Sequence, residues 1–309
     1  MLDFTNDFKE DSINEQLAKV DFPIDIMDIV DIPSTEYRQI RRTDTDTFMG
    51  MCKTRYKPIT HSQAFSGALK AMETHIDFTD AQCTIESYEG GAMAMMEIMF
   101  PNHTAKVGNH DLNLKFIARN SYNGRWKYQS FFGWLNQVCF NTLVSGQQLA
   151  YSSNRHTTHF DIKQANAKIQ SAVQCVTQDV ERFNAWWNTR ITDAQVVNLF
   201  KNTLAELKLG RARIVAGQSN VNQKCATILQ ILYDKEVTQI YGKGADYGRG
   251  GADGSLWCAY QAATEWSTHL ADVDGKESTK RHIVESQRQD AVRKMLNSTH
   301  WKKLEPELA

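Results

Sequence analysis

The sequence predicts an α+β fold, in which N-terminal antiparallel β-hairpins form a meander with one helix and a mostly helical C-terminal half follows. Between residues 37 and 160, turn residues separate short runs of β-branched and aromatic residues. From about residue 162, apolar residues recur at helical spacing instead. We therefore expect three regions: an acidic N-terminal arm over 1–36, a β-rich core over 37–160, and a helical region over 161–309 packed on that core.

The acidic arm carries most of the charge asymmetry of the chain. Residues 1–36 hold ten carboxylates against Lys9 and Lys19, a net charge of −8; because the whole chain carries −1, the remainder carries +7. This composition is typical of a solvated tail, here with one short strand, although an arm that packs only on a partner is an alternative. Clustered carboxylates can also imitate a nucleic-acid backbone or occupy a basic cleft.

Targeting and membrane signals are lacking. The N-terminus has no basic-then-apolar signal pattern, and no apolar run approaches the ~20 residues that a membrane helix needs. The six cysteines are scattered without a CxxC pair, which favours free thiols in a reducing compartment. We expect a cytoplasmic protein without membrane contact.

Residues 37–60 are expected to form three short strands, over YRQIRR, TFMGMC and RYKPIT, with TDTDT as the first turn. Basic residues outnumber the acids of this region, which are Asp44 and Asp46. The basic residues are Arg38, Arg41, Arg42, Lys53, Arg55 and Lys57. A basic β-surface can follow the phosphates of a nucleic acid, and an ordinary solvated sheet face is the alternative.

A helix over 61–77 and a hairpin over 81–100 are expected next. Thr60 can cap the helix, because Gln63 follows three residues later as in a capping box. Gly90-Gly91 is the expected turn of the hairpin.

Residues 112–134 are expected to form a central hairpin. Asn123-Gly124 is the strongest short-range signal for a two-residue type I′ turn, because both residue types tolerate positive φ. A two-residue loop also fixes the register, so that Tyr122 faces Arg125 and Arg119 faces Tyr128.

With that register, one face of the central hairpin combines cations with aromatic rings. Its members are Lys115, Ile117, Arg119, Trp126, Tyr128, Phe132 and Trp134. Single-stranded nucleic acid is bound in this way, since bases stack on rings and cations neutralise phosphates. The rings can equally pack under a helix while the cations reach out to solvent. Exposure of this face separates the two interpretations.

Helices are expected over 163–190, 192–209, 219–240, 255–270 and 276–304. Thr192 and Gln195 form a second capping box. The glycine-rich loop 241–254 can cradle a phosphate with Lys243 and Arg249, but it lacks the Walker signature.

Specific catalytic and metal-binding motifs are lacking. There is no HExxH or GxSxG, and the spacing of His103, His110 and Asp111 in the polar loop 101–111 fits no ligand motif. Arg155 and His156 form the best polar cluster, for a phosphate contact or for backbone bonding at a strand-to-helix junction. We expect no cofactor, no metal and no enzymatic activity; a metal-dependent nuclease is a distant alternative.

Several stretches resemble a family of phage- and plasmid-borne proteins. They are IRRTDTDTFMGMCKTRYKPI, VCFNTL at 138–143, RHT at 155–157 and GSLWCAYQAATEWSTHL at 254–270. The resemblance covers roughly residues 36–275 and is to the phage/plasmid-like protein family, a domain of unknown function, so it implies an intracellular protein of a mobile genetic element. The expected layout is also similar to that of single-strand annealing proteins of the Redβ and Erf kind.

These observations together predict a non-enzymatic single-stranded-DNA-binding or annealing protein, active in recombination or replication and forming a homo-oligomer. The alternative is a phage protein that binds and modulates a host protein, motivated by the acidic arm.

Overall fold

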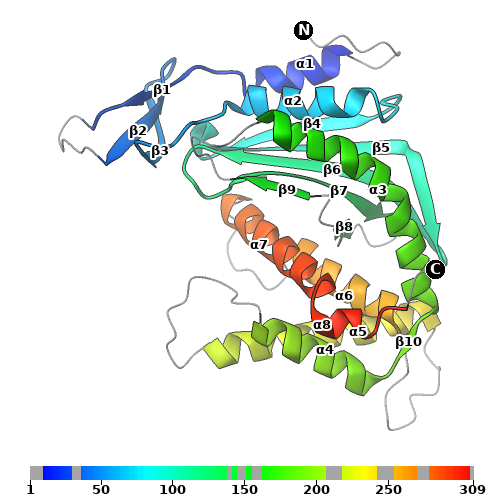
Figure 1. Cartoon of the computed structure of the whole chain (residues 1–309). Helices are drawn as coiled ribbons and strands as arrows, with labels where there is room; N and C mark the ends of the chain where they lie inside the picture. The colour runs from blue at the N-terminus through cyan, green and yellow to red at the C-terminus, as the bar shows by residue number, and fades with distance from the viewer. Residues whose placement is uncertain are drawn as a thin grey trace. The chain divides into compact units, whose positions relative to one another are not determined.

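The computed structural model describes residues 10–29, 36–137, 141–144, 151–154, 162–206, 218–241, 254–269 and 278–306 (Figure 1). Antiparallel sheets occupy the N-terminal part and helices most of the C-terminal half, which confirms the predicted α+β fold. The chain divides into two compact units. Unit 1 comprises 1–104, 113–133 and 147–176, and unit 2 comprises 105–112, 134–146 and 177–309.

The elements follow in chain order. The strands are β1 Ile24–Met27, β2 Tyr37–Arg42, β3 Thr47–Lys53, β4 Gln82–Tyr88, β5 Met93–Val107, β6 His110–Ser121, β7 Tyr128–Asn136, β8 Thr142–Val144, β9 Tyr151–Asn154, β10 Arg190–Ile191 and β11 Gly254–Ser255. The helices are α1 Glu10–Ala18, α2 His61–Glu73, η1 Glu89–Gly91, α3 Ile162–Asn188, α4 Asp193–Glu206, α5 Gln218–Tyr241, α6 Leu256–Thr268, α7 Ser278–Leu296 and α8 Thr299–Lys302.

The described strands form a small sheet, a large sheet and the two-stranded pair of β10 with β11. The small sheet has the order β1-β2-β3, and the large sheet has the order β4-β5-β6-β7-β8 with β9 paired to β7. The predicted strands over 37–42 and 47–52 are confirmed as β2 and β3. The third predicted strand, over 55–60, is wrong, because the chain turns after Lys53 and runs irregularly to the cap of α2.

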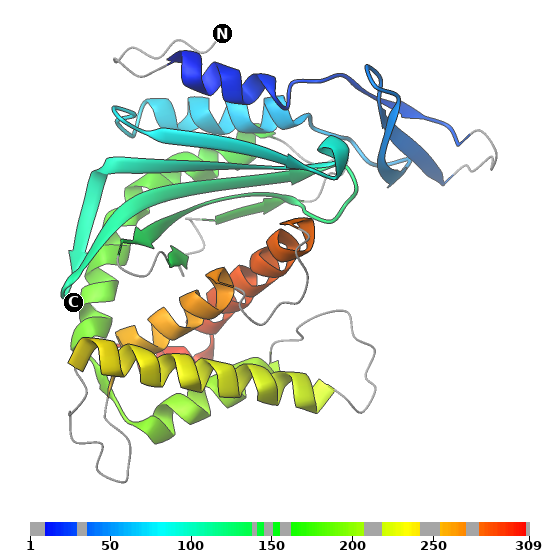
Figure 2. The same ribbon diagram turned by 180° about the vertical axis from the view of Figure 1, so that it is seen from behind.

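The acidic arm is folded over much of its length. Residues 10–18 form α1, which packs beside α2 and against β4 (Figures 1 and 2). Ile13 is completely buried, because an amphipathic helix must cover its apolar side, and Val20 in the turn after the helix is completely buried as well. The expectation of a solvated tail is therefore wrong for this segment, while the expected short strand is present as β1.

Helix α2 begins as predicted. The Thr60 hydroxyl accepts a hydrogen bond from the Gln63 backbone N–H at 3.1 Å, and Gln63 Oε1 accepts one from the Thr60 N–H at 3.3 Å. This capping box satisfies two backbone donors that the first turn leaves without partners. The helix ends at Glu73, four residues before the predicted end.

The hairpin over 81–100 is confirmed as β4 and β5, with Gly90 and Gly91 at its turn in left-handed conformations (φ 68° and 100°). The polar loop predicted over 101–111 is wrong. Strand β5 continues to Val107 and β6 begins at His110, so the chain reverses tightly at Gly108, whose φ is 55°.

The tip of the central hairpin differs from the prediction. Residues 122–127 separate β6 from β7, and Gly124 has a positive φ whereas Asn123 does not. The Ser121 hydroxyl bridges the wider loop, donating to the Trp126 carbonyl at 2.8 Å and accepting from its N–H at 3.0 Å. The type I′ turn is therefore wrong, because that turn needs positive φ at both of its central residues.

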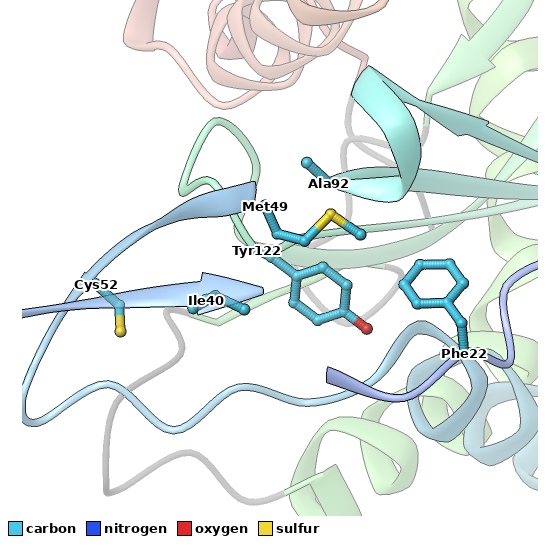
Figure 3. Close-up of a cluster of buried hydrophobic side chains, with 6 residues drawn as sticks. All are labelled: Phe22, Ile40, Met49, Cys52, Ala92 and Tyr122. Carbon is cyan, nitrogen blue, oxygen red and sulfur yellow. The ribbon is translucent and has the colours of Figure 1, made fainter. Parts of the chain in front are cut away.

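A buried cluster holds the inner face of the small sheet to the rest of unit 1 (Figure 3). Its members come from the small sheet, from the segment before β1, from the residue between η1 and β5 and from the loop after β6. They are Phe22, Ile40, Met49, Cys52, Ala92 and Tyr122. Gly50 makes this approach possible, because a Cβ there would lie 2.7 Å from the Cα of Asn123.

Helices α4 to α8 belong to unit 2, where α6 packs against α5, α7 and strand β8. Residues 192–195 form the second predicted capping box, at the start of α4. The carboxylate of Glu305 binds Arg182 at 2.6 Å and the indole N–H of Trp186 at 3.1 Å, which fixes the segment after α8 to α3. None of the described helices is both long and apolar enough to cross a membrane.

Candidate nucleic-acid interface

The cation-and-ring face of the central hairpin lies in the protein interior. Arg119 is 1% exposed, Trp126 4% and Tyr128 0%. The Trp126 ring meets Tyr88 edge-on, with centroids 6.0 Å apart, and burial raises the pKa of Tyr128 to about 12. The prediction of an exposed stacking platform is therefore wrong, because bases need access to the ring faces.

The two cations of that face are also engaged inside the sheet. Arg119 donates from Nε to the Met95 sulfur at 3.4 Å, and its guanidinium lies 5.9 Å from the Trp126 ring centroid. Lys115 pairs with Glu97 at 2.9 Å, and its side chain is 13% exposed. Both cations therefore have structural partners where the sequence predicted contacts to phosphates.

Four further predicted phosphate contacts, Arg155, His156, Lys243 and Arg249, lie outside the described residues. Their predicted roles stay predictions.

The remaining four predicted contacts surround the small sheet. Arg55 and Lys57 follow β3 and are exposed, and neither forms an ion pair with a residue that the structure describes.

Arg41 and Arg42 are the last two residues of β2 and point to opposite faces of the small sheet. Arg42 faces inward, with its guanidinium 4.0 Å from the Phe22 ring centroid, and its bidentate bond to Asp44 lowers the pKa of that carboxyl. Arg41 points to the opposite face.

This opposite face, which we call the outer face, is built from three rows of directly opposed residues. At one end Tyr37 lies opposite Lys53, and at the other Arg41 lies opposite Phe48. Between them Gln39 lies opposite both Met51 and Met27. Each end row thus pairs one aromatic ring with one cation, and Asp25 of β1 also lies opposite Arg41.

The outer face exposes a large apolar surface. Phe48 is 52% exposed and Met51 53%, and Tyr37 and Met27 are each nearly two-fifths exposed. These four residues lie on the three adjacent strands of one small sheet. Exposed apolar side chains gathered in this way mark binding surfaces in water-soluble proteins.

A β-bulge creates the outer face. The register shifts between Ile40 and Arg41, where Gly50 and Phe48 are their partners and Met49 has none. Strict alternation would place Phe48 and Met51 on opposite faces, because they are three residues apart. The extra residue restores both to the same exposed face.

A second group of residues that the sequence did not indicate lies in unit 2. The Glu236 carboxyl on α5 is 1% exposed and faces Glu265 on α6. Burial, and then the charge of Glu265, raises the pKa of Glu236 to about 7. Lys235 pairs with Glu265 at 2.5 Å. Groups with shifted pKa often mark functional sites, but a carboxyl this deeply buried offers no surface to a substrate.

The metal-binding alternative is not supported by the described residues, among which no three His, Cys, Asp or Glu side chains converge. His103 Nε2 lies 3.1 Å from the Asp77 carbonyl. The buried His110 bonds through Nδ1 to Asn136 at 2.8 Å, and burial lowers its pKa.

Comparison with known proteins identifies the family of the chain. No curated protein and no solved structure matches it. One family model, described as a domain of unknown function (DUF932), matches residues 49–297. That match includes β3 from Met49 onward, the large sheet and all the described helices from α2 to α7. The chain therefore belongs to the DUF932 family.

Proposed function

We propose that this protein binds single-stranded DNA, without catalysing a reaction, through the outer face of its small sheet. The observation that carries the proposal is the pair of ring–cation rows, Tyr37 with Lys53 and Phe48 with Arg41. Exposed rings on a β-sheet stack bases, at ~1–3 kcal/mol per base, and neighbouring cations meet phosphates.

The spacing of the rows favours a single strand over a duplex. Arg41 lies four positions after Tyr37 on β2, which places the two rows about 13 Å apart at the usual rise of a strand. Stacked bases of a duplex follow one another at about 3.4 Å and hide their faces. Two rings this far apart suit bases that are splayed from one strand, with Met51 and Met27 beneath the nucleotide between them.

Charge outside the face supports the same partner. Arg55 and Lys57 extend the basic surface beyond β3, where the backbone of a strand leaving the Tyr37–Lys53 row would pass. Each such contact to phosphate adds affinity that falls with salt.

Salt-dependent binding of a short fluorescent oligonucleotide tests the proposal. We expect Phe48→Ala and Tyr37→Ala each to weaken binding by ~1–3 kcal/mol, with thermal stability almost unchanged because both rings are exposed. Ile231→Ala is the matched control, since Ile231 is an exposed apolar residue of α5 at 61% exposure. Absence of binding at low salt, or equal loss in the control, would overturn the proposal.

A protein partner is the second candidate, and Met27 and Met51 favour it. Exposed methionines beside aromatic and arginine residues are typical of protein interfaces. A further variant, Met51→Ala, separates the candidates. If the partner is a protein, Met51→Ala should weaken the protein complex, and neither the natural protein nor any of the variants should bind the oligonucleotide.

We propose further that the protein acts in recombination or replication of a phage or plasmid, in the host cytoplasm and as a homo-oligomer. Rings or filaments seen by electron microscopy in the presence of single-stranded DNA would support annealing. A particle unchanged by DNA would favour the partner-binding alternative.

A further inference from the structure

The two cations of the outer face already have acidic partners within the protein. Arg41 Nε lies 2.8 Å from Asp46 Oδ1, and Arg41 Nη2 donates to the Asp46 carbonyl at 2.6 Å. Lys53 Nζ lies 3.9 Å from Glu36 Oε1. Each of these two cations is therefore paired with one carboxylate, in the neighbourhood where a bound strand would place a phosphate.

Both carboxylates are open to water. The side chain of Asp46 is 84% exposed and that of Glu36 71%. Exposed ion pairs contribute little to folding, so a phosphate can displace such a carboxylate at small cost. Asp25, opposite Arg41, is engaged differently, because its Oδ1 accepts the backbone N–H of Ile26 at 2.8 Å.

We infer that Asp46 and Glu36 are internal substitutes for the phosphates of the strand: they hold Arg41 and Lys53 on the outer face of the free protein and must be displaced when DNA binds. This inference rests on the proposed function of the same face. It assigns the two carboxylates a regulatory role, since they lower affinity and limit binding to strands that supply several phosphates at once.

The sheet offers a matched control. Asp28 and Asp44 pair with Arg38 and Arg42, whose positions on β2 alternate with those of the outer face. Asp28→Asn with Asp44→Asn removes the same charge from the same sheet without freeing an outer-face cation. The test variant is Asp46→Asn with Glu36→Gln. Asparagine suits position 46, whose φ is 51°, because it tolerates the left-handed conformation.

Binding of a poly-dT oligonucleotide at several salt concentrations tests the inference. We expect the test variant to bind roughly two- to tenfold more tightly than the natural protein. The salt slope should steepen by up to about 0.7 for each freed cation, because a cation shared with its own carboxylate neutralises a phosphate only in part. The control variant should show a clearly smaller gain on both measures.

Equal gains in the test and control variants would show a general charge effect and overturn the inference, while leaving the proposed function intact. If the natural protein binds DNA but the test variant binds no more tightly, the inference is again overturned and the proposed function stays intact. If neither the natural protein nor the test variant binds at low salt, the proposed function itself fails and the inference fails with it. Melting curves of both double variants check that the sheet stays folded.

Discussion

Arg119 shows how one buried residue depends on its neighbours. Its guanidinium lies 5.9 Å from the Trp126 ring and 5.7 Å from the Phe131 ring, and Met95 accepts its Nε–H. Burying a cation is costly unless such contacts replace water. The rings that the sequence suggested for DNA thus contribute to the interior of unit 1.

Truncating these rings should therefore affect folding and not DNA binding. We expect Trp126→Ala and Tyr128→Ala each to lower the free energy of unfolding by ~3–5 kcal/mol, as large-to-small core substitutions do. Urea denaturation measures this loss. The exposed Phe48→Ala serves as control, with an expected change within ~0.5 kcal/mol. Two nearly unaffected ring variants would contradict the buried placement.

At the residue scale, sequence reasoning identified the cations of the small sheet but not its exposed rings. Phe48 and Met51 are three residues apart, and only the bulge at Met49 brings them to one face. This bulge accompanies the packing of Met49 and Cys52 in the buried cluster under the sheet. The spacing of residues along the sequence does not reveal such packing.

At the element scale, local signals were the reliable ones. The capping box at Thr60 and the glycine pair at 90–91 are decided within a few residues, and both are confirmed. The type I′ turn predicted at Asn123-Gly124 does not form, because tertiary contacts determine the conformation of that loop. Tyr122 donates its backbone N–H to the Ala92 carbonyl and packs in the cluster under the small sheet.

The pairing of α5 with α6 should make stability depend on pH. Glu236 has a pKa of about 7 in the folded protein, above its ordinary value of 4.5. The folded state therefore holds a proton between pH 4.5 and 7 that the unfolded state has lost. The stabilisation is complete below pH 4.5 and declines as the pH rises to 7, by on the order of 3 kcal/mol.

Denaturation curves of the natural protein and of Glu236→Gln across this range check the prediction. The free energy of unfolding of the variant should decline much less than that of the natural protein as the pH rises from 4.5 to 7. At pH 8 the variant should be the more stable of the two, because glutamine keeps the shape of the side chain without the buried charge. Parallel pH profiles for both proteins would contradict the assignment to Glu236.

At the scale of the whole molecule, the fold class could be predicted from the change in the spacing of apolar residues near residue 162. The packing of the acidic arm could not be predicted from its composition. Ile13 and Val20 are buried in unit 1, and β1 completes the small sheet. Removing residues 1–36 would expose that interior, so the arm is better probed by single carboxylates such as Glu36 than by truncation.

The most direct test of the outer face is ultraviolet cross-linking of single-stranded DNA to the intact protein, followed by mass spectrometry of the cross-linked peptides. Our account predicts adducts on Phe48 and Tyr37, which are exposed, and none on Trp126 or Tyr128, which are buried. Adducts should disappear as salt rises. Cross-links confined to peptides outside residues 24–57 would contradict the proposed binding face.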